Sequence, residues 1–118
     1  MIERPWEKSY PAGVSWDLDP PVKPLDAVLD EAVRQWPDNT VCDFLDRKLS
    51  YSDLADLVER AAKGFQQLGV RPGVHVGLFL PNTPHYLIAF FGILKAGGTV
   101  VNYSPLDAER ELEHKIED

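Results

Sequence analysis

Cysteine, basic residues and long apolar runs are scarce in this chain of 118 residues. Cys42 is the only cysteine, which excludes an intrachain disulfide and a spaced metal-thiolate site. The 12 Lys and Arg against 19 Asp and Glu give a formal net charge of −7, which disfavours binding to nucleic acid or to an anionic membrane. The N-terminus has no signal-peptide core, and no apolar run reaches the length of a membrane span. We therefore expect a soluble, cytoplasmic protein.

Signatures of catalysis are also missing from the sequence. It contains neither a lysine-bearing phosphate loop nor a serine nucleophile elbow. Gly97 and Gly98 follow a helical pattern, whereas a phosphate-binding glycine loop precedes a helix, whose N–H groups then reach the anion. The histidines, none of which has a second histidine at ligand spacing, are His75, His85 and His114. His85, close to Asn82, is interpreted as a structural or half-exposed residue, with the lining of a ligand cavity as the alternative.

Proline is abundant at the N-terminus, where half of the ten prolines fall within residues 1–24. Because proline fixes φ and removes a backbone donor, we predict that this Pro-rich N-terminal arm has no regular structure. The arm also carries Trp6, Tyr10 and Trp16. We favour packing of these rings on the chain's own core, since aromatic side chains bury the largest area per residue. The alternative is that the arm docks on a partner subunit.

From residue 25 the pattern becomes that of helices and strands. Apolar residues recur every three or four positions over residues 25–36, which predicts a helix that Pro37 ends. Residues 40–45 alternate like a strand, and a short strand at Leu49 would complete a hairpin. Residues 46–48 are predicted to form its turn.

A second helix is predicted directly after the hairpin. Ser50 and Asp53 resemble a capping box at its start, and Gly69 falls where a left-handed residue would end it. Its buried stripe runs along residues 54–68. The ion pairs expected between residues four apart on its surface are Asp56–Arg60 and Glu59–Lys63.

A β-α-β pattern then occupies residues 74–105. Two strand-like runs, residues 74–80 and 99–103, flank an almost wholly apolar helical run at residues 83–96. Strands joined through a helix are parallel, and parallel strands are buried on both faces. The unit therefore needs neighbours, yet only a short acidic helix with Leu112 and Ile116 on one side is predicted after it. We predict an α/β fold with a partial mixed or parallel sheet and flanking helices, organised as the arm and an incomplete α/β segment, residues 25–118.

Several motifs together resemble the opening segment of the AMP-forming acyl-CoA synthetases, which belong to the adenylate-forming superfamily. In chain order they are LSYSDL (49–54), LGVRPG (68–73), LPNTP (80–84), AFFGILKAGG (89–98) and VNYSPL (101–106). Each motif alone is modestly specific, whereas their order and spacing together are specific. Val74 and Ser104 depart from residues common in the family. Within the superfamily, the arm and residues 89–114 are most similar to bacterial long-chain fatty acid–CoA ligases.

The resemblance implies the N-terminal segment of the large domain of the adenylate-forming fold, which supports the acyl and nucleotide sites. The implied reaction converts ATP, a fatty acid and CoA into acyl-CoA, AMP and pyrophosphate, with Mg²⁺ assisting. In the family, the phosphate loop, the Mg²⁺-associated acid, the nucleotide contacts and a C-terminal lysine lie beyond the position of Asp118. We therefore assign no catalytic, cofactor-binding or metal-binding residue here, and we expect this chain alone to be inactive and to bind no cofactor.

Alternatives to the long-chain interpretation remain open. One alternative is that the chain is the same part of another adenylating ligase, an aryl-acid or medium-chain acid–CoA ligase. The other is a stand-alone interaction or dimerisation module derived from such an enzyme. The implied partners are the rest of the parent enzyme and, through the N-terminal arm, a second copy of the chain. Peripheral contact of the parent enzyme with the inner face of a membrane is also implied for the long-chain members, and no nucleic acid is expected.

Overall fold

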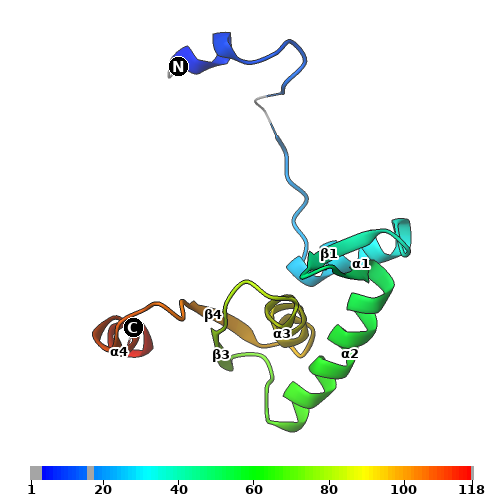
Figure 1. Cartoon of the computed structure of the whole chain (residues 1–118). Helices are drawn as coiled ribbons and strands as arrows, with labels where there is room; N and C mark the ends of the chain where they lie inside the picture. Colours follow the sequence, from blue (N-terminus) through cyan, green and yellow to red (C-terminus); the bar gives the residue numbers. More distant parts are fainter. Residues whose placement is uncertain (1–3, 16–17, 118) are drawn as a thin grey trace.

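The computed structural model describes residues 4–15 and 18–117 of the chain. Figure 1 shows the arm extending away from a group of helices and strands, with α4 on another side of that group. The radius of gyration is 18.2 Å, larger than the roughly 13–14 Å of a compact domain of this length. The difference arises because the arm and α4 extend away from the other helices and strands. The elements are η1 (Pro5–Ser9), α1 (Leu25–Gln35), β1 (Thr40–Phe44), β2 (Arg47–Ser50), α2 (Tyr51–Gln67), β3 (His75–Phe79), α3 (Pro84–Lys95), β4 (Thr99–Tyr103) and α4 (Glu109–Glu117).

The described part of the N-terminal arm has no regular structure, as predicted, apart from one short helix, and its rings do not pack on the core. Residues Pro5–Ser9 form a 3₁₀ helix, with proline at its first turn where a missing N–H costs nothing. Trp6 and Tyr10 are 51% and 54% exposed, so the interpretation that packed these rings on the chain's own core is wrong. Trp16 lies outside the described residues.

The helix α1 and the β1–β2 hairpin are confirmed, except for the turn between the strands. The turn consists of Leu45 and Asp46, with φ of +50° and +61°, so Arg47 and Lys48 belong to β2. Two successive left-handed residues make the hairpin turn whose twist matches that of the flanking strands. Leucine is an uncommon residue in this conformation, and for that reason the predicted turn, residues 46–48, began one residue too late.

The capping box at the start of α2 is confirmed. The Ser50 hydroxyl accepts from the Asp53 backbone N–H at 3.1 Å, and the Asp53 carboxylate accepts from the Ser50 N–H at 3.0 Å. This bond from the Ser50 backbone N–H lowers the pKa of Asp53 below its usual range. The two hydrogen bonds satisfy N–H groups that the first turn of the helix leaves without intrahelical partners.

The same C-terminal capping motif, with a left-handed glycine, ends both helices that lead into parallel strands. Gly69 after α2 and Gly97 after α3 have φ of +94° and +92°, which a side chain would disfavour. The next N–H in each case bonds back into the helix at 2.9 Å, from Val70 to a carbonyl of α2 and from Gly98 to a carbonyl of α3. The repeated motif turns the chain by a similar path into β3 and β4.

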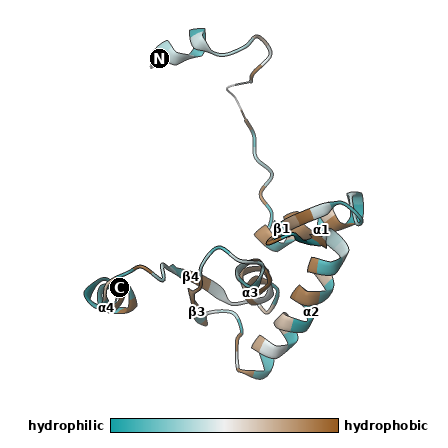
Figure 2. Ribbon diagram, viewed as in Figure 1, coloured by the Kyte–Doolittle hydropathy of each residue, from teal (hydrophilic) through white to brown (hydrophobic). Residues whose placement is uncertain are grey.

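The β3-α3-β4 unit has the predicted parallel arrangement. His75 lies opposite Thr99 and Phe79 opposite Tyr103 in a two-stranded parallel sheet. Every residue of α3 except His85 is buried or partly buried, and Figure 2 shows this helix as hydrophobic nearly all round. The α3 side of the sheet is covered, whereas Phe79 on the other side is 50% exposed.

The main core lies between α2 and α3, which pack closely. Leu54, Val58 and Ile93 are at most 1% exposed. A Cβ atom added at Gly92 would lie 2.9 Å from the Ala61 Cβ, so the absence of a side chain at this position lets the two helices approach. Small residues at a helix contact permit a short interaxial distance and dense packing.

An ion-pair network joins the first three α-helices. The Lys95 ammonium, at the end of α3, lies 2.8 Å from the carboxylates of both Asp30 on α1 and Glu59 on α2. The expected pair of Glu59 with Lys63 is thus replaced by a tertiary contact, while the Asp56–Arg60 pair is confirmed at 2.8 Å. Hydrogen bonds to Asp30 first and to Glu59 second raise the pKa of Lys95 above its ordinary value.

Two glycine-to-alanine substitutions should distinguish the effect of helix propensity on the free energy of unfolding from the effect of packing between helices. Gly64→Ala is expected to raise the free energy of unfolding by about 0.5–1 kcal/mol, because its new Cβ would meet nothing within 4 Å. Gly92→Ala gains the same propensity but crowds Ala61, and overpacking costs about 1–3 kcal/mol, so we expect a net loss of about 1 kcal/mol. Urea denaturation followed by circular dichroism measures both values, and equal stabilisation by the two variants would contradict the packing.

Removal of the Lys95 charge should loosen the attachment of α1. Lys95→Met is expected to lower the free energy of unfolding by about 1 kcal/mol, since it breaks two partly exposed ion pairs, each worth about 0.2–1 kcal/mol. Lys63→Met, an exposed change on α2, is the matched control and should stay within about 0.5 kcal/mol of the original.

The pH dependence of this difference identifies the charge as its cause. Because the pKa of Lys95 is raised in the folded chain, its stabilisation is fully present below the ordinary value of 10.5 and disappears as the pH rises through the higher folded value. The stability gap between the original chain and Lys95→Met should therefore be constant at neutral pH and close above about pH 10.5. A gap that persists in strong alkali would point to lost packing of the lysine stem instead.

Candidate functional site

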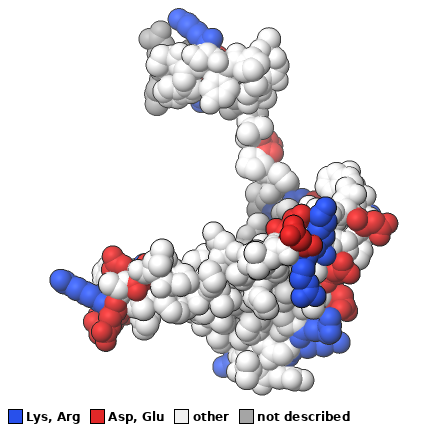
Figure 3. Space-filling model, in the orientation of Figure 1, with Lys and Arg blue, Asp and Glu red and all other residues white. Residues whose placement is uncertain are grey.

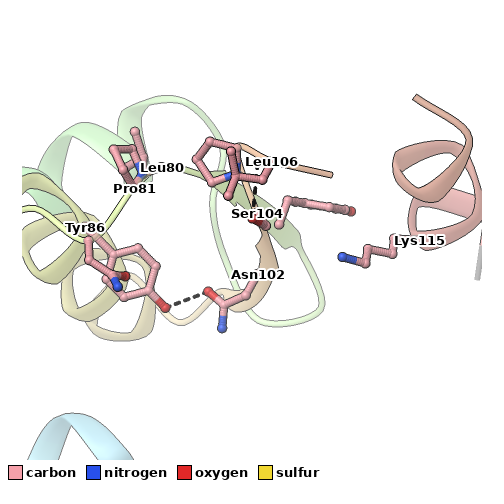
Figure 4. A pocket seen from close by; sticks show the side chains of 10 residues that line it. Leu80, Pro81, Tyr86, Asn102, Ser104, Leu106 and Lys115 are labelled. Atoms are coloured by element: carbon pink, nitrogen blue, oxygen red, sulfur yellow. Dashed lines mark hydrogen bonds between the residues drawn. The ribbon is translucent and has the colours of Figure 1, made fainter. Parts of the chain in front are cut away.

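A cavity lies at the carboxyl ends of both parallel strands. Its volume is about 710 Å³, within the range typical of small-molecule sites. The position is the one where open α/β sheets bind ligands, since loops leaving neighbouring parallel strands meet at this edge. Figure 4 shows the side chains around it. The lining residues are Leu80, Pro81, Asn82, Tyr86, Asn102, Tyr103, Ser104, Pro105, Leu106 and Lys115.

A side-chain hydrogen bond between α3 and β4 forms one wall of the cavity. The Tyr86 hydroxyl donates to the Asn102 side-chain oxygen at 2.7 Å, as drawn in Figure 4. The Tyr86 ring is also stacked on Phe90 of the same helix, with 5.9 Å between ring centroids. These contacts fix the orientation of the Asn102 amide and leave its nitrogen to donate further hydrogen bonds.

The loop after β3 contributes a second amide to the same cavity. Asn82 is exposed, and within the described part of the chain its side chain makes no hydrogen bond. A smaller cavity of about 340 Å³ continues from Asn82 and Tyr86 to the hairpin, where Phe44 and Cys42 line it. The amide of Asn82 therefore stands where the two cavities adjoin, with both its donor and its acceptor available.

The turn after β4 positions the only cation that lines the larger cavity among the described residues. The Asp107 carboxylate accepts from the Ser104 backbone N–H at 2.9 Å and lies 2.5 Å from the Lys115 ammonium of α4. The hydrogen bond from Lys115, followed by that from Ser104, lowers the pKa of Asp107. The opposite charges of this pair cancel locally, so the cavity carries no net charge from this source.

The charge distribution and the metal-ligand inventory give no second site. In Figure 3 the charged side chains gather over α1 and α2 and over α4, with a largely uncharged surface between. No three His, Cys, Asp or Glu side chains within residues 4–15 and 18–117 come together as a metal-binding group. In the same residues, no helix combines the length and apolarity needed to cross a membrane.

The histidines singled out in the sequence lie apart from one another and from the cavity. All three are exposed: His75 begins β3, His85 is in the first turn of α3 and His114 is on α4. His85 is not among the lining residues, so the interpretation that it lines a ligand cavity finds no support in the geometry. Tyr86 and Asn102 were not recognised from the sequence as site residues, since only the parallel pairing brings them together.

The fold and this cavity define an α/β unit with a ligand-sized cavity at the carboxyl ends of its parallel strands. Residues 29–118 match the family described as "AMP-binding enzyme". The chain belongs to that family. The resemblance to adenylate-forming enzymes that the motifs indicated is therefore confirmed.

The relatives include enzymes named for two different acids. A long-chain-fatty-acid–CoA ligase of Bacillus subtilis is 34% identical over 116 residues, which are 98% of this chain and 21% of the relative. A salicyl-AMP ligase/salicyl-S-ArCP synthetase of Mycobacterium tuberculosis is 39% identical over 111 residues, 90% of this chain and 19% of the relative. This chain thus spans about a fifth of the length of the curated relatives that it matches.

Solved structures agree with the fold. The apo structure of MbtA from Mycobacterium smegmatis has a TM-score of 0.74 and 42% identity, over 80% of this chain and 18% of that one. The N-terminal subdomain of Klebsiella oxytoca NpsA, in complex with 3-hydroxyanthranilyl-AMSN, has a TM-score of 0.78 over 81% of this chain and 25% of that one. At 23% identity the NpsA likeness shows the fold alone. The predicted α/β class and its place in the N-terminal subdomain of the adenylate-forming fold are confirmed.

Proposed function

We propose that this chain is the N-terminal part of an AMP-forming acid–CoA ligase that acts on long-chain fatty acids. The observation that carries the proposal is the match over 98% of the chain, arm included, to a long-chain-fatty-acid–CoA ligase at 34% identity. The match to the salicyl-AMP ligase covers 90% of the chain, and this supports an aryl acid as the second candidate substrate. ATP, Mg²⁺ and CoA are the cofactors and co-substrates of the proposed reaction.

In this proposal the chain supplies a scaffold and one edge of the site rather than the reacting groups. Its cavity at the carboxyl ends of β3 and β4 is lined by amides, hydroxyls and a lysine paired with Asp107, none of which is a strong nucleophile or base. The two free edges of the β3–β4 sheet and the half-exposed Phe79 favour further polypeptide beside this unit. The chain alone is therefore proposed to be inactive.

The activity is tested on the complete gene product that contains this chain. With ATP, CoA and palmitate it should release AMP and form palmitoyl-CoA, and palmitate should be preferred over salicylate by kcat/KM. The 118-residue chain in the same assay should give no ATP–pyrophosphate exchange above a blank. Preference for salicylate would replace the long-chain proposal by the aryl-acid one, and absence of AMP release with every acid would refute both. Turnover by the 118-residue chain would refute the scaffold role.

A second role, homodimerisation through the arm, is favoured by one specific observation. The apolar side chains of the described arm are largely exposed, and they do not cover the chain's own core; Trp6, Tyr10, Val14, Leu18 and Val22 are between 45% and 106% exposed. Burial of such side chains stabilises by about 25 cal/mol per Å² removed from water, which favours their insertion into a second copy of the chain.

The oligomeric state tests this role. Light scattering of the chain at increasing concentration should show a rise from 13.3 kDa towards twice that mass. Substitution of Trp6 and Tyr10 by Ser should weaken the dimer at least tenfold, while Leu68→Ser, which changes an apolar side chain that is 82% exposed outside the arm, serves as the control. A monomer at every concentration, or equal effects of the arm and control substitutions, would contradict the proposal.

A further inference from the structure

We propose that the cavity between the β1–β2 hairpin and the start of α3 receives the indole ring of Trp6 from the arm of a second copy of the chain. The inference rests on the proposed homodimerisation through the arm and deepens it, because it names the surface on which the arm docks. Each copy carries an arm and such a cavity, so two copies can exchange arms reciprocally in a closed dimer.

The walls of this cavity suit an aromatic side chain. Its volume is about 340 Å³, at the lower end of the range of roughly 300–1000 Å³ for ligand sites, which a single large ring can fill. Phe44 of the hairpin lines one side, and Pro84 and Leu87 of α3 line the other. Because Phe44 is 36% exposed and Leu87 is only partly buried, a ring inserted between them removes apolar surface from water on both sides.

The Asn82 amide can orient the ring that enters. The indole N–H of tryptophan is a donor only, so the ring needs one acceptor beside it when it becomes buried. Asn82 lines the cavity, and its side-chain oxygen accepts no hydrogen bond from residues 4–15 and 18–117. One acceptor in the wall of the cavity therefore matches the single donor of the incoming side chain.

The charge beside Trp6 complements the charge at the cavity. Residues 4–15 of the arm carry two cations and one anion, and the cation Lys8 lies two residues after Trp6. Asp43 is the charged residue among the described ones that line the cavity, and its pair with Lys48 is 3.9 Å long and more than half exposed on both sides. Such an exposed pair is weak, so Asp43 can exchange it for a cation of the arm. Opposite charges at the rim of an interface favour the encounter and fix the orientation of the partners.

The base of the arm favours a second copy over the chain's own cavity. Pro20, Pro21 and Pro24 lie just before α1, and Pro24 has the extended dihedral angles φ −58° and ψ 145°. A proline-rich segment is a stiff, extended spacer, which disfavours folding of the arm back onto its own chain. Figure 1 shows the arm extending away from β1 and α3, and Trp6 is 51% exposed. The same stiffness presents Trp6 to another molecule.

The alkylation rate of Cys42, the only thiol of the 118-residue chain, tests the assignment. Cys42 lines the cavity and is partly buried, so a docked ring should block its reaction with iodoacetamide. The rate should fall roughly tenfold when the chain concentration is raised to about ten times the dissociation constant of the dimer, measured by light scattering. In Trp6→Ser the rate should not depend on concentration. Leu68→Ser, an exposed apolar change outside the arm, is the control and should behave like the original chain.

The outcomes distinguish a failure of this site from a failure of the homodimer itself. A chain that stays monomeric by light scattering would refute homodimerisation and this inference with it. A dimer whose Cys42 reacts as fast as that of the monomer would leave the homodimer standing and overturn the assignment of the cavity. Protection of Cys42 that depends on Trp6 but not on concentration would place the ring in the cavity of its own chain, which also overturns the proposal.

Discussion

The parallel pairing of β3 with β4 is the constraint on which the rest of this structure depends. Parallel strands cannot be joined by a tight turn, so the chain must cross over the sheet, and α3 is that crossover. Because α3 has the sheet on one side and α2 on another, hardly any of its surface remains for polar residues. The common strand direction also brings the loops after both strands to one edge, and with them Asn82 and Asn102.

The surrounding elements stabilise this unit by different means. The contact of α2 with α3 depends on close packing. Gly92 has no side chain to separate the two helices, and Ile93 is fully buried. The attachment of α1 combines the burial of Leu29 with the charge of Lys95, which reaches carboxylates on two helices. The attachment of α1 therefore combines apolar burial with ion pairing, whereas the α2–α3 contact depends on close packing.

Much of the fold could be predicted because its signals are local. The capping box at Ser50, the left-handed glycines and the periodicity of the helices each involve residues within one or two helical turns. The tight turn at Leu45 could not be predicted, since its left-handed backbone is set by strand pairing rather than by a glycine or asparagine. The partner of Glu59 was likewise missed, because Lys95 lies far away in sequence.

The candidate site was harder to predict than the fold. Its amides at Asn82 and Asn102 are separated by the whole of α3, and nothing in their spacing indicates that they face one cavity. The family resemblance predicted the class of enzyme. It indicated no site residue within this chain, because the reacting groups of the family are expected after the position of Asp118. The cavity forms only because the parallel pairing of β3 and β4 brings the loops after the two strands together, and this pairing cannot be derived from the spacing of the two asparagines.

The central proposal is that the β3-α3-β4 unit supports a larger sheet that continues into further polypeptide. Amide hydrogen exchange, measured for the 118-residue chain and for the complete gene product, tests it most directly. The account predicts that the outward N–H groups of β3 and β4 exchange rapidly in the isolated chain and become protected in the complete protein, while the core of α2 and α3 is protected in both. Equal and rapid exchange of both strands in the complete protein would contradict it.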